Sequence, residues 1–126
     1  MKFSVSSNKL LACMQALTRV VAAKSSLTIL ESVLFELDGN RLTLTASDSE
    51  TTLRTSIEVE NAEGAGRVGF GARLLLETLK ELPDQTLIFD INDQNFGLNI
   101  YSNNGNYSFV GVNGNDYPEM PSDSEN

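Results

Sequence analysis

Apolar and polar residues alternate through residues 30–56, and the same alternation returns 54 positions later in the chain. An ungapped superposition places Val33 over Leu87 and Leu42 over Phe96. This alternation predicts β-strands with one buried face, because successive side chains of a strand point to opposite faces. A slip of one residue would invert every side chain, so the retained phase indicates one structural unit used twice. The two units need a shared core, because a unit of this size cannot bury its apolar face alone.

A short strand and an amphipathic helix precede each copy. The apolar stripe of the first helix consists of Leu10, Leu11, Met14, Leu17, Val20 and Val21. The second helix is expected over residues 72–82. Its apolar stripe consists of Leu75, Leu76, Leu79 and Leu82. Spacings of three and four residues place each set on one helical face, and Glu77 stands at pairing distance from Arg73 and Lys80.

The expected strands cover residues 2–5, 30–37, 41–47, 51–60, 67–70, 86–91, 95–101 and 105–111. The order is therefore β-α-β-β-β twice, with one repeat over about 1–60 and the other over about 66–111. Antiparallel hairpins with two helices on one face of the sheet define an α+β fold. We expect the helices to pack side by side, so that their polar faces form one outer surface.

The periodicity is lost from Val112 onward, and the tail begins at Asn113. This tail is rich in Gly, Asn, Ser and acidic residues, and it contains prolines. We expect one domain over residues 1–121 and the start of an interdomain linker over residues 122–126. A linker at this point predicts that the chain is part of a longer protein.

The net charge of −8 is unevenly distributed along the 126 residues. Residues 1–30 carry Lys2, Lys9, Arg19 and Lys24 and no acidic residue, which gives +4, while the rest of the chain carries −12. This polarity predicts a mildly basic surface on an acidic body. An acidic total argues against a polyanionic partner only weakly, because the local field decides such binding.

The residues needed for most enzyme chemistry are missing. The chain has no histidine, a single cysteine (Cys13) and no glycine-rich phosphate loop, so we expect no catalysis, no cofactor and no metal. Asp48 and Glu50 allow a carboxylate metal site as a remote alternative, although polar turn residues are the simpler interpretation. No signal peptide or membrane-spanning segment is predicted, and the lone cysteine fits a reducing cytoplasm.

Several segments, in this order, are similar to the first domain of the bacterial sliding-clamp family, the DNA polymerase III beta subunit. They are Met1-Lys2-Phe3, the helix around Leu10-Leu11, Ser26–Glu31, Leu42–Asp48, Gly71–Leu75 and Asn115-Asp116-Tyr117-Pro118. Thr28 and Gly71 depart from the family, which usually has proline at both positions. The resemblance covers residues 1–121.

The resemblance implies a non-catalytic processivity factor for the replicative polymerase. Two chains of three such domains would form a head-to-tail ring, with helices lining a hole around duplex DNA. By position, Lys24 matches a basic residue in the loop after the first helix, and Arg73 and Lys80 match basic residues on the second. The helical pattern itself adds Lys9 and Arg19. Scattered cations suit sequence-independent phosphate contacts.

The resemblance also places Tyr107 and Phe109 at the dimer interface, where this strand pairs with the third domain of the neighbouring chain. Alternation equally allows both residues to be part of the core. Polymerase and clamp loader would bind through domains that this chain does not contain. The alternative function is a protein-interaction module that uses exposed strand edges and has no DNA role.

Overall fold

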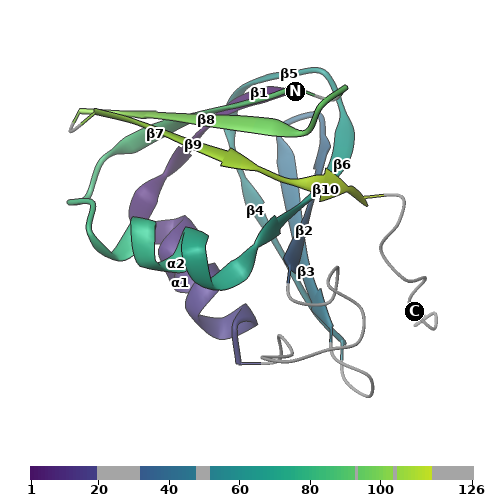
Figure 1. Ribbon diagram of the computed structural model, residues 1–126, viewed down its shortest axis with the longest axis horizontal. Coiled ribbons are helices and arrows are strands. Elements are labelled where there is room, and N and C mark those ends of the chain that lie inside the picture. Colours follow the sequence, from purple (N-terminus) through teal and green to yellow (C-terminus); the bar gives the residue numbers. More distant parts are fainter. Residues whose placement is uncertain (20–31, 48–51, 93, 104, 115–126) are drawn as a thin grey trace.

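The computed structural model describes residues 1–19, 32–47, 52–92, 94–103 and 105–114. Within them, two helices, α1 (Ser7–Leu17) and α2 (Ala72–Lys80), pack against two five-stranded antiparallel sheets (Figure 1). The strands are β1 (Lys2–Ser6), β2 (Ser32–Asp38), β3 (Arg41–Ser47), β4 (Thr52–Glu58), β5 (Glu60–Glu63), β6 (Gly66–Gly71), β7 (Thr86–Ile91), β8 (Gly97–Ser102), β9 (Gly105–Val110) and β10 (Val112–Asn113). The predicted α+β class and doubled unit are confirmed, and the sheet is divided in two.

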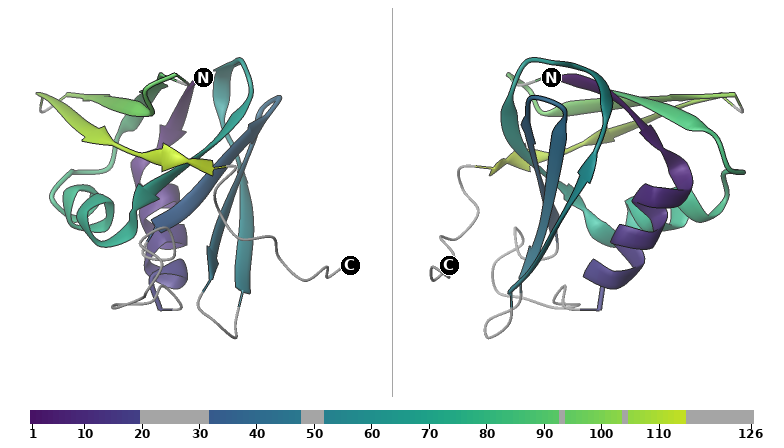
Figure 2. Two further views of the ribbon diagram at one scale, coloured as in Figure 1. Left: turned by 45° about the vertical axis from the view of Figure 1, so that its right-hand side comes forward. Right: turned by 180° about the vertical axis from the view of Figure 1, so that it is seen from behind.

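The two copies exchange their first strands. One sheet has the order β5-β1-β7-β8-β9 and the other has the order β10-β6-β2-β3-β4. Strand β1 of the first copy therefore pairs with β7 of the second, and β6 of the second copy pairs with β2 of the first. The views in Figure 2 show each sheet running through both copies. This exchange gives the copies one shared core.

Each copy ends with a strand that crosses to the other sheet, so the single strand expected over residues 51–60 is wrong. The chain leaves β4 at Val59 and continues as β5 in the opposite sheet. It crosses in the same way at Gly111, between β9 and β10. The Val59 N–H donates to the carbonyl of Asn40 at 2.8 Å, and the Gly111 N–H donates to that of Phe96 at 2.8 Å. These equivalent bonds fix both corners.

The register of the copies differs by two residues from the ungapped superposition. Leu37 pairs with Leu42 in the first copy, whereas Ile91 pairs with Leu98 in the second. Leu42 therefore corresponds to Leu98, and the expected match with Phe96 is wrong. Because the shift is even, every side chain keeps its face, which explains why the alternation stays in phase.

The turns of the first hairpins account for this shift. In the first copy, Asp38 pairs with Arg41 across a two-residue turn, and Gly39 has a φ of 60°, a left-handed conformation that glycine adopts without steric cost. In the second copy, the Asn92 side chain accepts hydrogen bonds from the N–H groups of Gln94 and Asn95, at 2.8 and 3.2 Å. This longer turn delays the start of β8 by two residues.

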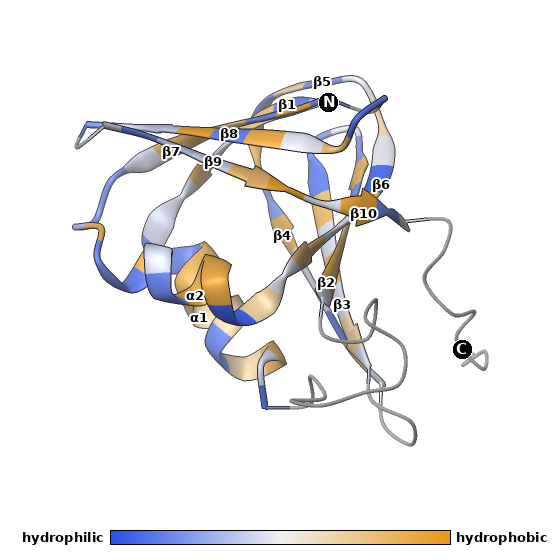
Figure 3. Ribbon diagram, in the orientation of Figure 1, coloured by the Kyte–Doolittle hydropathy of each residue, from blue (hydrophilic) through white to orange (hydrophobic). Residues whose placement is uncertain are grey.

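The core lies between the two sheets and the helices. Phe35 is fully buried, with its ring 5.4 Å from that of Phe70 and 6.2 Å from that of Phe89. Phe3 stacks on Phe89 at 5.2 Å. Because Phe35 and Phe70 belong to one sheet and Phe3 and Phe89 to the other, this cluster joins the sheets. Figure 3 shows apolar residues alternating with polar ones along the strands that cover the core.

The helices bury most of the predicted stripes. Leu10, Met14, Leu17, Leu75, Leu79 and Leu82 are buried, and Leu11 and Leu76 are partly buried against the same core. Val20 and Val21 lie outside the described residues. The helices contact each other, as expected, and lie on the same side of the molecule. Their outward faces therefore form a common surface, which carries the candidate site.

Candidate nucleic-acid interface

After Lys9 in its first turn, helix α1 presents short, uncharged side chains to solvent. It begins after Ser6, whose hydroxyl accepts a hydrogen bond from the Lys9 N–H at 3.4 Å. The exposed positions along its middle are Ala12, Gln15 and Ala16. Short side chains offer few groups for specific contacts, so this surface suits a partner that moves along it.

Helix α2 carries one cation at each end of its exposed face. Arg73 lies in its first turn and Lys80 is its last residue, and both are exposed. Seven residues make about two helical turns, so the two side chains project from the same side. Glu77 forms no ion pair with either of them, so the predicted pairs are wrong; the ion pair found among the described residues joins Arg67 to Glu36, at 3.1 Å.

The electrostatics of the first turn of α2 favour an external anion over a structural role for Arg73. The first turns of both helices contain no acidic residue, and Gly71 offers no side chain to cap α2. The amino-terminal end of a helix carries partial positive charge, so a cation there gains nothing from the helix itself. The charge of Arg73 and the partial charge of the helix end therefore reinforce each other, and the resulting positive potential attracts an anion.

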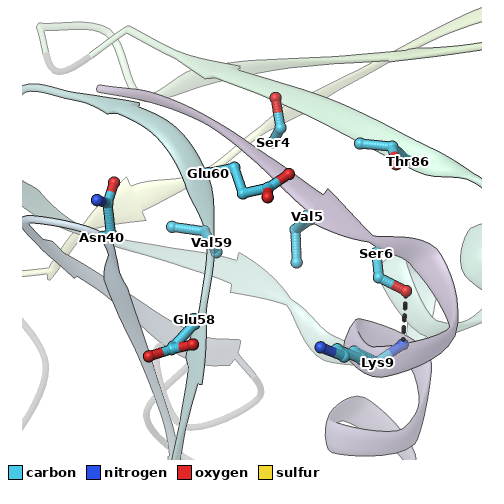
Figure 4. A pocket seen from close by; sticks show the side chains of 9 residues that line it. All are labelled: Ser4, Val5, Ser6, Lys9, Asn40, Glu58, Val59, Glu60 and Thr86. Carbon is cyan, nitrogen blue, oxygen red and sulfur yellow. Dashed lines mark hydrogen bonds between the residues drawn. The ribbon is translucent and has the colours of Figure 1, made fainter.

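Lys9 occupies a different environment from Arg73 and Lys80. It lines a cleft of about 390 Å³ between the start of α1 and the corner at Val59, and Glu58 and Glu60 line the same cleft (Figure 4). This cleft therefore carries more negative than positive side chains, although no ion pair joins Lys9 to either carboxylate. The contact of Lys9 with DNA stays a prediction, and it has less support than that of the α2 cations.

The other predicted cations lie beyond the helices. Helix α1 ends at Leu17, so Arg19 is exposed in the turn that follows and is not part of the helical face. Lys24 lies outside the described residues, as do Asp48 and Glu50. Among the described residues, no three Cys, Asp or Glu side chains gather where a metal ion could be held.

Tyr107 and Phe109 share the inward face of β9, the edge strand of its sheet. Phe109 pairs with Leu98 and Tyr107 with Ile100, and both aromatic side chains are half-buried against the core. They therefore contact the core while lying on an open edge. Their place in the core is confirmed, and their place at a dimer interface stays a prediction.

Two features of the helices were not anticipated from the sequence. Leu74 is 61% exposed beside Arg73 on α2, and its place just outside the apolar stripe is the signal that could have identified it. On α1, burial raises the pKa of the Cys13 thiol above its ordinary value of 9.0, and a hydrogen bond with Thr55 lowers it in part. A protonated, partly buried thiol is typical of a structural cysteine and not of a reactive one. Neither helix has the length and apolar content to cross a membrane, within the ranges described.

Two adjacent helices against two sheets, each built from both copies of a repeated unit, define a DNA-clamp domain. The sequence model of the "DNA polymerase III beta subunit, N-terminal domain" matches residues 1–121. The beta sliding clamp of Pseudomonas aeruginosa is 30% identical over 120 residues, which make up 95% of this chain and 32% of that protein. The chain therefore belongs to the beta sliding clamp family, whose members are non-catalytic processivity factors, and it corresponds to their N-terminal domain.

Solved structures of the family have the same fold. The DNA polymerase III subunit beta of Pseudomonas aeruginosa superposes with a TM-score of 0.89 at 27% identity, over 97% of this chain and 33% of that one. The Helicobacter pylori beta clamp bound to a DNA ligase peptide superposes with a TM-score of 0.88 at 25% identity, over 97% of this chain and 34% of that one. The chain thus spans about a third of the length of these relatives.

Proposed function

We propose that residues 1–121 form the first of three domains of a sliding clamp that encircles duplex DNA and confers processivity on a replicative polymerase in the cytoplasm. Two such chains would close a head-to-tail ring, to which this domain contributes one sixth. Residues 122–126 would begin the linker to the second domain. The proposal rests on the family, on the share of its length that this chain spans, and on the surface formed by the two helices.

The observation that carries the DNA role is the pair Arg73 and Lys80 on the exposed face of α2. Within the part of the chain that the structure describes, neither cation has a carboxylate partner within ion-pair distance, and both lie on the helix that packs beside the short side chains of α1. A ring holds DNA by topology, so it needs attraction to phosphates without tight contacts to bases. Lys24, Lys9 and Arg19 are further candidates for the same attraction.

The acidic remainder of the domain supports the same function. Attraction between exposed charges fades over about 8–10 Å at physiological salt. Cations on the helices can therefore attract DNA although the whole domain is acidic. Tyr107 and Phe109 would belong to the contact between neighbouring subunits, and polymerase and clamp loader would bind elsewhere on the ring.

A salt series tests the DNA role in the full-length protein that carries this domain. We expect Arg73→Ala with Lys80→Ala to weaken DNA binding at low salt and to reduce the slope of log K against log salt by about two, because each phosphate contact contributes about 0.9. The matched control is Lys2→Ala with Arg41→Ala, which removes two exposed cations from strands. An unchanged slope in the first variant would contradict the assigned roles and favour an interaction module without a DNA role.

A further inference from the structure

The exposed face of α2 carries a carboxylate between its two cations. Arg73, Glu77 and Lys80 follow one another at spacings of four and three residues, which places all three side chains on one side of the helix. All three side chains are exposed. Within the bounds of the two described helices, Glu77 is the single acidic residue. A negative charge therefore stands in the middle of the surface that the proposed function assigns to DNA.

The fold gains little from the charge of Glu77. Within the described part of the chain, its carboxylate lies beyond ion-pair distance of Arg73 and Lys80, and its side chain has no hydrogen-bond partner. A helix favours negative charge in its first turn, and Glu77 lies past the first turn of α2. A role in folding therefore does not account for this residue.

The positions around Glu77 offer a phosphate no hydrogen-bond donor. Leu74 precedes Glu77 by three residues and exposes an aliphatic side chain. Ala12 and Ala16 are exposed on α1, the helix that contacts α2. Arg73 and Lys80 are separated by about 10 Å along the helix axis, at about 1.5 Å per residue. Over that distance a phosphate meets an aliphatic side chain and a carboxylate.

We propose that Glu77 limits the affinity of α2 for phosphates, so that DNA attracted by Arg73 and Lys80 is released quickly and the clamp slides. The inference rests on the proposed function, and it adds to the same site a residue that opposes binding. Coulomb's law gives the sign, because a phosphate near either cation is also repelled by the carboxylate. Two cations and one carboxylate leave this face with a net charge of +1, which attracts DNA without holding it tightly.

A sliding ring needs this balance because topology already prevents its escape. A contact between α2 and a phosphate must break before the ring can advance along the duplex. Tighter contacts therefore slow the movement and add nothing to retention. Phosphate contacts are also independent of sequence, so the effect of Glu77 is the same everywhere on DNA.

Equilibrium binding of the full-length protein to a short linear duplex tests the effect on affinity. At about 0.05 M NaCl, we expect Glu77→Gln to bind about two- to fivefold more tightly than the unmodified protein, which is the range of one exposed charge pair. Glu77→Lys should raise the affinity by roughly the square of that factor, because it changes the charge by two. Both gains should shrink as the NaCl concentration rises to about 0.2 M, because salt screens exposed charges. A gain that does not depend on salt would contradict the electrostatic mechanism and overturn the inference.

The matched control is Glu63→Gln, which removes an exposed carboxylate from β5, at the end of the domain opposite the helices (Figure 1). It should leave the affinity unchanged. An equal gain in this control, or no gain in Glu77→Gln, would overturn the inference. The proposed function would survive either result if Arg73→Ala with Lys80→Ala still weakened binding. If neither the Glu77 change nor the double change altered binding, both would fail.

Diffusion of the loaded ring along DNA tests the effect on sliding. In single-molecule fluorescence, the ring with Glu77→Gln should diffuse about two- to fivefold more slowly than the unmodified ring, because each phosphate contact lasts longer by the factor gained in affinity. The ring with Glu63→Gln should diffuse at the unmodified rate. Equal diffusion of all three rings would overturn the claim that Glu77 favours sliding.

Discussion

Ser7 and Gln85 form a double link between the start of α1 and the segment that follows α2. The Ser7 N–H donates to the Gln85 carbonyl at 2.8 Å, and the Gln85 N–H donates to the Ser7 hydroxyl oxygen at 2.9 Å. The same hydroxyl donates to the Pro83 carbonyl at 3.2 Å. Ser7 is 1% exposed, so water cannot replace these bonds. The link ties the two copies together directly beneath the helical surface.

Ser7→Ala should destabilise the domain by about 1–3 kcal/mol, because it removes a buried hydroxyl and two hydrogen bonds, to the Gln85 N–H and the Pro83 carbonyl, each worth about 0.5–1.5 kcal/mol. Urea unfolding measures the free energy of unfolding. The control, Ser56→Ala, removes an exposed hydroxyl and should change stability by less than about 0.5 kcal/mol. Equal effects of the two changes would show that the link contributes little.

Phe35→Ala should reduce the free energy of unfolding by about 3–5 kcal/mol, because Phe35 contacts aromatic rings from both sheets and leaves a cavity when truncated. Leu74→Ala is the control on an exposed position and should lie within about 0.5 kcal/mol of the parent. A loss below about 1 kcal/mol for Phe35→Ala would mean that the sheets are joined by other contacts.

Gly71→Ser should stabilise the domain by about 0.5–1 kcal/mol. Gly71 precedes α2 with a φ of −56°, and an added Cβ would meet no atom within 4 Å. Serine can cap the helix there and restricts the unfolded chain. The same change at Gly39, whose φ is +60°, should cost about 1–2 kcal/mol. The melting temperatures of both variants check the opposite signs, and a fall for Gly71→Ser would refute the capping argument.

Cys13 should make stability depend on pH above its ordinary pKa of 9.0. Burial raises the pKa of the folded thiol, so above pH 9.0 the thiol of the unfolded chain ionises first, which lowers the free energy of the unfolded state. The contribution of Cys13 is therefore fully present below pH 9.0 and is lost as the pH rises through the folded pKa. Cys13→Ser should remove this loss. Urea unfolding from about pH 8 to about pH 10 measures the free energy of unfolding of both proteins. The same dependence on pH in both would disprove the effect.

The sequence pattern predicts the elements well because local periodicity determines them. Leu10, Met14 and Leu17 recur at helical spacing and are buried as expected, as are Leu75 and Leu79. The exchange of β1 and β6 between sheets was not predictable in this way, because periodicity identifies the buried face of a strand but not its partner. The corner at Val59 was missed for a related reason, since alternation continues through it.

The candidate site was predicted less completely than the fold. Helical spacing placed Arg73 and Lys80 on one exposed face, which the structure retains. The same spacing included Arg19, but α1 ends at Leu17. It also gave no sign that Glu58 and Glu60 line the same cleft as Lys9, because these residues are distant in sequence and the cleft forms at the crossing at Val59.

The most direct test of the central claim is retention of the full-length protein on closed circular DNA. The protein is loaded onto circular duplex by a clamp loader, washed at high salt, and then the circle is cut once. Because topology holds the ring, we predict retention on the closed circle and rapid loss after linearisation. Equal retention on circular and linear DNA, or loss from both in high salt, would contradict an encircling clamp.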